Sequence, residues 1–272
     1  MRRTKSTTLT YILLTIAAMV AAAPLAGVII IAFYPPNAPV SGLTLSHLNF
    51  SNIVQVWQTG DFGGTLTWST IIALVTVIIT VGVSVPAGFA FATIRFPGRS
   101  HFFYSIILGL LLPPAAVLIP VYYEIRSMHL TGSAWSVILP TAGFSIAFGV
   151  FWMRAAFLSL PRELIEAASI DGATTNIVLT KVALPLVRAP AMVLVLLTFV
   201  GSWNSFLIPL VMLAGSNVQT APLSLAAFQG GHVDDIPGMA ASAVFILLPA
   251  VLIYLLTQRH FIRGLTEGGI KM

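Results

Sequence analysis

Six long apolar stretches that contain almost no charge constrain this chain more than any other feature. They lie at about residues 9–33, 68–94, 101–123, 135–157, 185–213 and 239–256. A helix needs about 20 apolar residues to cross the hydrocarbon core of a bilayer, and each stretch is near that length. Helices satisfy their own backbone hydrogen bonds in lipid, whereas irregular segments do not. The sequence therefore predicts an all-α polytopic membrane protein, with six transmembrane helices in one domain over residues 1–272.

The composition supports the same class. Of the 272 residues, 57% are hydrophobic and only 8% are charged, whereas soluble domains carry about 25% charged residues. The chain contains no cysteine, which excludes a disulfide framework, a thiolate metal site and a cysteine nucleophile.

The first apolar stretch has two interpretations. The run Ala21-Ala22-Ala23 resembles the cleavage site of a signal peptide. However, the stretch is about 25 residues long, beyond the 7–15 residues of a signal-peptide core. We therefore expect an uncleaved first transmembrane helix.

The basic residues indicate the orientation. An even number of spans puts both termini on one side, and placing the N-terminus inside leaves only Arg126 outside. The basic residues then on the inner side are Arg2, Arg3, Lys5, Arg95, Arg99, Arg154, Arg162, Lys181, Arg188, Arg259, Arg263 and Lys271. By the positive-inside rule, we expect a multi-pass protein of the cytoplasmic (inner) membrane with both termini in the cytoplasm. The tail 258–272 would then be cytoplasmic.

A short charged helix is predicted at about residues 162–172, between the fourth and fifth stretches. Pro161 suits a first helical position, and Glu163 and Glu166 lie where the helix dipole favours acid. Gly172 can adopt the left-handed conformation that closes a helix. Such a helix is about 15 Å long, half of a bilayer crossing, so it should lie beside the membrane. A second short helix is expected at about 175–183.

This short helix either rests on the lipid surface or binds a soluble partner. An amphipathic helix at the surface is usually rich in basic residues, because the cytoplasmic leaflet is anionic. The two carboxylates, Glu163 and Glu166, therefore favour a protein partner.

The same segment carries a resemblance. Glu166-Ala167-Ala168, Gly172 and then Val182-Ala183-Leu184-Pro185 are similar to the EAA motif of bacterial ABC importer permeases, with Val182 where isoleucine is usual. The segments 201–207 and 258–271 also resemble the carbohydrate-uptake branch of that family, which includes the maltose permease subunit MalG. The resemblance covers most of the chain and is strongest from Phe151 onward.

The resemblance implies a type I ABC importer permease with defined partners. These are a second homologous permease (a heterodimer), two ATPase subunits that bind ATP and Mg²⁺, an external solute-binding protein and a sugar substrate. The short helix would be the coupling helix, held in a groove of the ATPase. Its coupling residues would be Glu163, Glu166, Ala167, Ala168, Asp171 and Gly172.

Two further segments receive roles from the resemblance. The end of the chain, with Glu267, Gly268 and Gly269, would contact the ATPase. The loop 214–238 would face the binding protein, through Phe228, Gln229 and Gly230.

No catalytic or cofactor motif is evident in the chain. It lacks the phosphate-binding pattern G-x-x-x-x-G-K-[ST] and the pattern G-x-G-x-x-G, so an ATPase must be a separate polypeptide. His232, Asp234 and Asp235 lie in a glycine-rich loop without an evident fourth metal ligand, which is more typical of a solvated turn. We expect neither an enzyme, nor a bound cofactor or metal, nor a nucleic-acid partner.

The spans also indicate an uncharged solute and speak against secondary transport. None has a central acid or lysine, which a proton- or sodium-coupled carrier usually keeps at mid-membrane. Trp203, Asn204 and Ser205, near the middle of the fifth stretch, are candidates for the substrate path. Equally, they could pack helices together.

The sequence therefore predicts the permease subunit of an ATP-driven importer that moves a sugar or sugar-like solute by alternating access. A glycerol-phosphate or polyol importer is an alternative within the same class. A channel or secondary carrier that works without ATP is an alternative from another class.

Overall fold

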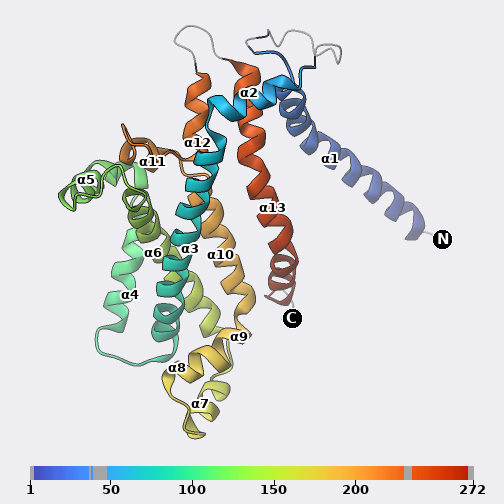
Figure 1. Ribbon diagram of the computed structural model, residues 1–272. Coiled ribbons are helices and arrows are strands. Elements are labelled where there is room, and N and C mark those ends of the chain that lie inside the picture. Colours follow the sequence, from blue (N-terminus) through green and yellow to red (C-terminus); the bar gives the residue numbers. More distant parts are fainter. Residues whose placement is uncertain (1–2, 37, 39–47, 230–234, 269–272) are drawn as a thin grey trace. The chain divides into compact units, whose positions relative to one another are not determined.

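The computed structural model describes residues 3–36, 38, 48–229 and 235–268, and every regular element in these ranges is helical (Figure 1). The chain divides into two compact units. The first comprises Met1–Thr65 and Leu223–Leu248, and the second comprises Leu66–Pro222 and Pro249–Met272. That the whole chain forms one domain stays a prediction.

The helices follow one another with few long connections. The α-helices are α1 (Arg3–Ala32), α2 (Ser51–Thr59), α3 (Phe62–Thr93), α4 (Arg99–Leu108), α5 (Pro114–Ser127), α6 (Trp135–Leu158), α7 (Arg162–Ile170), α8 (Thr175–Ile177), α9 (Leu184–Leu186), α10 (Arg188–Trp203), α11 (Leu207–Met212), α12 (Ala221–Ser224) and α13 (Ile236–Gly268). Short 3₁₀-helices cover Gly109–Leu111 and Leu225–Phe228. A π-helix covers Val178–Ala183.

The predicted all-α membrane fold is confirmed. Four stretches are long and apolar enough to cross a bilayer: Thr10–Ala32, Phe62–Thr93, Trp135–Leu158 and Ile236–Ile253. The described residues give six spans if two bent helix pairs each count as one. These pairs are Arg99–Leu111 with Pro114–Ser127, bent by 106°, and Thr175–Leu186 with Arg188–Trp203, bent by 83°.

Consecutive prolines bend the third predicted span. Leu112 and Pro113 are extended, with ψ of 115° and 127°, because a residue that precedes proline is sterically excluded from the helical region. Pro120 lies in the same predicted span, but α5 continues through it. A single proline removes only one helical hydrogen bond, which helices in a bundle tolerate.

The fifth predicted span, 185–213, differs more from expectation. Its main helix, α10, ends at Trp203, and the chain leaves helical geometry at Asn204 before α11 begins at Leu207. Trp203, Asn204 and Ser205 therefore lie at the end of a helix and not in the middle of a span. Asparagine and serine favour helix ends because their side chains compete for backbone hydrogen bonds.

The first unit contains a helix that the sequence did not predict. Residues 35–66 lie between the first two predicted spans, yet α2 forms there and α3 begins at Phe62. The buried Asn52 Nδ2 donates a 2.8 Å hydrogen bond to the carbonyl oxygen of Ala32, at the end of α1. Trp57 and Phe62 pack their rings against Phe245, at 5.1 and 4.9 Å between centroids. Tertiary contacts therefore stabilise a polar segment as a helix.

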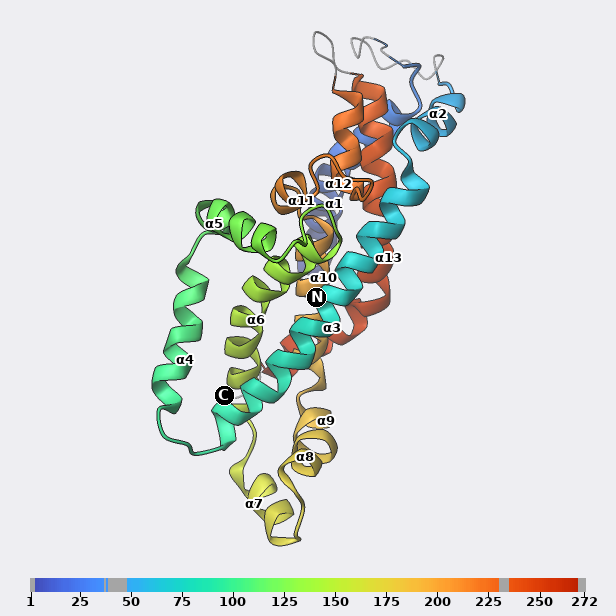
Figure 2. The ribbon, with the colours of Figure 1, turned by 60° about the vertical axis from the view of Figure 1, so that its left-hand side comes forward.

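In the second unit, α3, α6 and α10 run beside one another (Figure 2), with α6 packed on α10. Glycines allow α3 and α6 to approach closely. A Cβ at Gly88 would lie 2.7 Å from Met153 Cβ and 2.9 Å from the Arg154 backbone nitrogen, and a Cβ at Gly149 would meet the Ser84 hydroxyl. Small residues at such crossings are common in membrane proteins, where close packing drives helix association.

The α3–α6 crossing yields a prediction about stability. Gly88→Ala should lower the thermal unfolding temperature in mild detergent, because overpacking against a backbone atom costs about 1–3 kcal/mol. Gly82→Ala on the same helix is the matched control, since nothing lies within 4 Å of its Cβ position. Equal unfolding temperatures for the two variants would contradict the close crossing.

Candidate functional site

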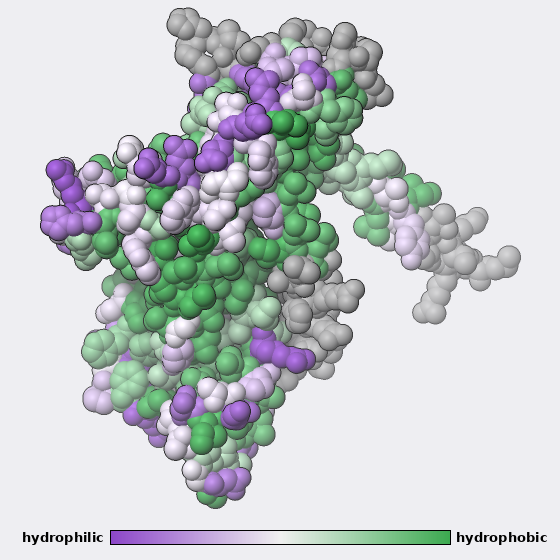
Figure 3. Space-filling model, viewed as in Figure 1, coloured by the Kyte–Doolittle hydropathy of each residue, from purple (hydrophilic) through white to green (hydrophobic). Residues whose placement is uncertain are grey.

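The short helix α7 lies with α8 and α9 at one end of the second unit, beyond the ends of α6 and α10 (Figures 1 and 2). Pro161 precedes α7 with φ −57° and ψ 127°, and Glu163 lies in its first turn. Space-filling side chains show an apolar middle of the unit and more hydrophilic groups toward the end with α7 (Figure 3). The sequence prediction of a charged helix here agrees with this placement.

A Schellman motif closes α7. The backbone nitrogen of Gly172 donates to the carbonyl oxygen of Ser169 at 3.1 Å, and that of Ala173 donates to Ala168 at 3.0 Å. Gly172 has φ +81°, the left-handed conformation that this motif requires and that glycine adopts without steric cost. Nothing lies within 4 Å of its Cβ position, so the backbone conformation alone constrains this residue.

One face of α7 packs on the chain's own core. Ile165, Ala168 and Ala173 rest on a hydrophobic cluster that includes Phe89 and Phe157. The rest of that buried cluster is formed by Val85, Ala92, Met153, Val178, Ala183, Val187 and Leu194. These residues come from α3, α6, the π-helix and α10, so the cluster on which α7 packs joins several helices.

The predicted coupling residues do not all lie on the same face of α7. Glu163, Glu166, Ala167 and Asp171 are exposed. Ala168 instead packs inward on the cluster beneath α7. Leu164 is 44% exposed.

Sequence reasoning missed Ile170. This side chain is 85% exposed at the end of α7, beside Asp171. An exposed large apolar residue between carboxylates is suited to insertion into a partner's pocket. The signal was visible in the sequence, because Ile170 does not belong to the apolar stripe that contains Ile165 and Ala168.

A hollow of about 380 Å³ lies beside α7 in the second unit. Glu166 and Arg162 of α7 line it, together with Arg95 from the connection before α4 and Arg99 at the start of α4. The tertiary structure thus brings Arg95 and Arg99 next to α7, a proximity that their spacing in the sequence did not indicate.

The substrate-path candidates do not form one cluster of side chains. Trp203 is 1% exposed and stacks on Phe199, with 5.6 Å between ring centroids. Asn204 is exposed, and the backbone of Ser205 donates to Ser202 at 3.2 Å. The indole therefore packs within the bundle, and a role of Trp203 in the substrate path stays a prediction.

Buried hydroxyl groups are a polar feature of the bundle that the sequence analysis did not single out. Within the described ranges, these buried hydroxyls have no hydrogen-bond partner: Thr65, Thr76, Thr80, Thr141, Ser202 and Thr220. They come from α3, α6, α10 and the segment before α12. Threonine and serine are common in apolar helices, so the sequence alone does not show which of these hydroxyls are buried.

The two remaining predicted contact segments are described only in part. Phe228 is buried and Gln229 is exposed, while Gly230 lies outside the described residues. Glu267 and Gly268 belong to the last turn of α13, which replaces part of the expected polar tail, and Gly269 lies outside the described residues.

The residues weighed as a metal site give no ligand cluster in the described part of the chain. No group of three His, Cys, Asp or Glu side chains there could hold an ion. His232 and Asp234 lie outside that part. Asp235 Oδ1 accepts a 3.2 Å hydrogen bond from the backbone of Gly238 in the first turn of α13.

These features define a polytopic helical membrane protein that presents a short, exposed helix on an otherwise apolar bundle. Comparison with known families then identifies the particular group. The model for the binding-protein-dependent transport system inner membrane component matches residues 84–267, and the chain belongs to this family. It is therefore an ABC importer permease, the noncatalytic inner-membrane component of a complex with an ATPase and a binding protein. No cofactor is expected on this component.

Individual relatives agree with the family. The arabinooligosaccharides transport system permease protein AraQ of Halalkalibacterium halodurans is 32% identical over 262 residues, 93% of this chain and 92% of the relative. The sn-glycerol-3-phosphate transport system permease protein UgpE of Pectobacterium atrosepticum is 32% identical over 240 residues, 85% and 84% of the two chains.

A solved structure shows the same fold. It is the crystal structure of a bacterial ABC transporter involved in the import of the acidic polysaccharide alginate. One of its chains matches with a TM-score of 0.77 and 21% identity, over 96% of this chain and 98% of that chain. The predicted permease fold is thereby confirmed.

The Schellman motif yields a prediction about local stability. Gly172→Val should speed amide hydrogen exchange at residues 172 and 173 by about tenfold, because the left-handed conformation costs a non-glycine residue about 1–2 kcal/mol. Gly172→Asn is the matched variant and should exchange at close to the native rate, since asparagine tolerates this conformation. Equal exchange in the valine and asparagine variants would show that this backbone conformation does not govern closure of α7.

Proposed function

We propose that this permease moves a sugar or sugar-like solute across the inner membrane by alternating access. The observation that carries the proposal is the extended similarity to an arabinooligosaccharide permease, over 93% of this chain. The charge distribution supports a neutral solute. The long apolar helix α3 has no charged residue, and α6 has one, Arg154.

A phosphorylated solute is the main alternative, because UgpE is also 32% identical. A phosphate in the path would favour a basic side chain that faces it. Arg154 lies against the neighbouring helices α3 and α4: its Nε donates to the Phe91 carbonyl at 3.2 Å, and its guanidinium lies 4.1 Å from the Phe103 ring centroid. Both contacts are with residues of the chain's own helices, so Arg154 is a weak candidate for binding a solute phosphate. This favours the neutral sugar.

We further propose that α7 docks in a groove of the ATPase subunit. Glu163, Glu166, Ala167 and Asp171 would contact the groove directly, together with Ile170. Since Ile165 and Ala168 rest on a cluster built by α3, α6 and α10, a displacement of α7 would reach three helices of the bundle. Gly172 would hold the end of α7 at the required angle.

A second homologous permease completes the proposed pathway. The helix α1 supports this proposal, because residues 10–26 are all exposed although they are predominantly apolar. Such a surface is stable only against lipid or another membrane protein. Asn204 and Ser205 stay candidates for the substrate path, with Trp203 as packing support. Phe228, Gln229 and Gly230 are proposed to face the binding protein, and Glu267, Gly268 and Gly269 to face the ATPase.

Orientation and docking can be tested with single cysteines, since the chain has none of its own. We expect Gln58→Cys on α2 to react with an impermeant maleimide in intact spheroplasts. Ser169→Cys on α7 should react only in inside-out vesicles, and more strongly after the ATPase is stripped off. A reversed pattern would refute the cytoplasmic termini, and labelling of Ser169→Cys that ignores the ATPase would refute docking.

Transport itself tests the function. In proteoliposomes that contain the complete importer, ATP should drive uptake of radiolabelled arabinotriose, and Glu166→Lys should abolish it because the acid at the docking face becomes basic. Glu124→Lys on α5 is the matched control, with the same charge change at another exposed position, and should transport normally. Normal uptake by Glu166→Lys would refute the role of this residue in coupling.

Competition in the same assay separates the solute classes. Unlabelled neutral oligosaccharides should inhibit uptake, and glycerol 3-phosphate should not. Uptake of labelled glycerol 3-phosphate in place of arabinotriose would support the phosphate alternative. Uptake that persists without ATP and collapses with the ion gradient would instead support a secondary carrier.

A further inference from the structure

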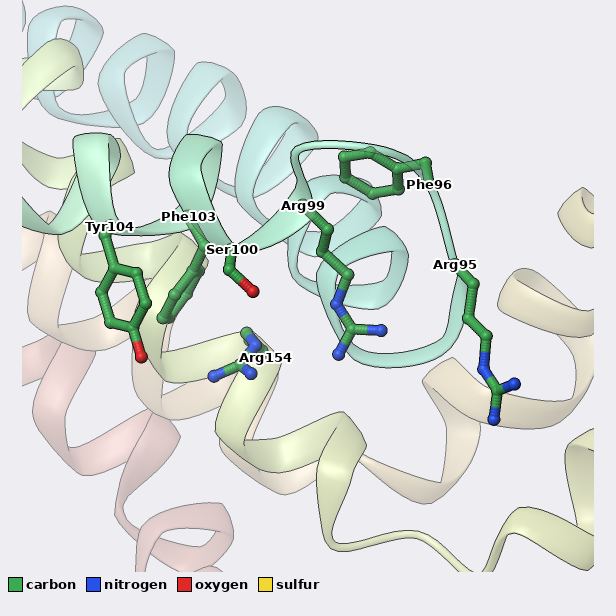
Figure 4. Close-up of a pocket in the computed structure, with 7 residues that line it drawn as sticks. All are labelled: Arg95, Phe96, Arg99, Ser100, Phe103, Tyr104 and Arg154. Carbon is green, nitrogen blue, oxygen red and sulfur yellow. The ribbon is translucent and has the colours of Figure 1, made fainter.

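A second hollow, of about 290 Å³, lies near the start of α4 in the second unit (Figure 4). Its lining holds Arg95, Arg99 and Arg154, and among the described residues that line it there is no acid. Figure 4 shows Arg99 and Arg154 reaching toward the same space from α4 and α6, with Tyr104 beside them. Three cations that share one hollow repel one another, so an anion placed between them is stabilising.

The arginines keep donors available for such an anion. Arg154 uses Nε on the Phe91 carbonyl and Arg99 uses Nη1 on the Ile94 carbonyl, which leaves other guanidinium N–H groups of each. Planar guanidinium groups bind phosphate through paired hydrogen bonds. The hydroxyls of Ser100 and Tyr104 also line the hollow, and the first-turn amides of the ten-residue helix α4 favour negative charge.

The surroundings of the hollow indicate the source of the phosphate. Within α4 only Phe103 is buried, and the exposed apolar residues that continue from the hollow are Phe102, Tyr104, Leu108 and Leu111. A surface of this kind suits acyl chains. The volume is near the lower end of the about 300–1,000 Å³ typical of small-molecule sites, which suits a headgroup and not a whole lipid.

We propose that this hollow binds the phosphate headgroup of an anionic phospholipid, whose acyl chains lie along α4. Basic hollows at the cytoplasmic face of membrane helices are suited to such headgroups. The inference does not depend on which solute the importer carries. The proposed site also adjoins α7, because Arg95 and Arg99 line both this hollow and the one that contains Arg162 and Glu166.

Native mass spectrometry of the importer, purified through this tagged chain, tests the proposal with phosphatidylglycerol and phosphatidylcholine as probes. The double variant Arg95→Gln/Arg99→Gln should bind phosphatidylglycerol about tenfold more weakly, the loss expected for charge-assisted hydrogen bonds. Arg154 is left unchanged because its contacts support packing. Binding of phosphatidylcholine should stay equally weak in both proteins.

The control is Arg126→Gln/Arg188→Gln, which removes the same charge at exposed positions outside the hollow. It should retain phosphatidylglycerol at the native level. An equal loss in both double variants would show a general charge effect and overturn the site. Unchanged binding in Arg95→Gln/Arg99→Gln would do the same.

Three further results distinguish the lipid from free phosphate, from the ATPase and from an effect of misfolding. Displacement of the lipid by millimolar inorganic phosphate would show that the hollow takes free phosphate, and would overturn the lipid assignment. Loss of the ATPase from the Arg95→Gln/Arg99→Gln complex with lipid binding intact would assign the hollow to the ATPase instead. Arg95→Lys/Arg99→Lys keeps the charge, so binding between the native and glutamine levels, at a native unfolding temperature, would support the paired guanidinium contacts.

Discussion

The contact between the inner face of α7 and the hydrophobic cluster beneath it is the interaction on which the proposed mechanism depends. Ile165 and Ala168 rest on a cluster of side chains from α3, α6, the π-helix and α10, and each buried methylene group contributes about 0.8 kcal/mol. A helix of nine residues is too short to be stable alone in water. Its tertiary contacts therefore both fold α7 and join it mechanically to the bundle.

The bundle itself combines close packing with breaks in its helices. Gly88 and Gly149 let α3 approach α6 so closely that side chains at these positions would collide. Elsewhere Pro113 and the residues after Trp203 interrupt the helical geometry, and the segment before α10 is bent by 83°. Interruptions of this kind are tolerated where neighbouring helices satisfy the freed backbone groups. A closely packed α3–α6 pair beside bent segments suits the proposed alternating-access mechanism.

Charge is concentrated near the segment that connects α3 to α4. Arg95 and Arg99 line two hollows, one with Arg154 and the other with Arg162 and Glu166. The hollow beside α7 and the proposed lipid site consequently have two arginines in common. Any anion that fixes these side chains would also fix one wall of the hollow beside α7.

The sequence by itself determined the membrane class, the number and approximate position of the apolar stretches, and the existence of α7 with its closing glycine. These follow from local properties: the length of apolar runs, the placement of acids and proline, and the tolerance of glycine for positive φ. It did not predict α2, because that helix depends on the bond from Asn52 to Ala32 and on the packing of Trp57.

Only the tertiary structure decided which side chains face inward and which residues meet. It turned Ala168 toward the core, ended α10 at Trp203 and brought Arg95 and Arg99 beside Arg154 and Glu166. The physical reason is that apolar periodicity specifies a helical stripe but not its partner. Contacts between residues far apart in the sequence are fixed only when several helices pack together.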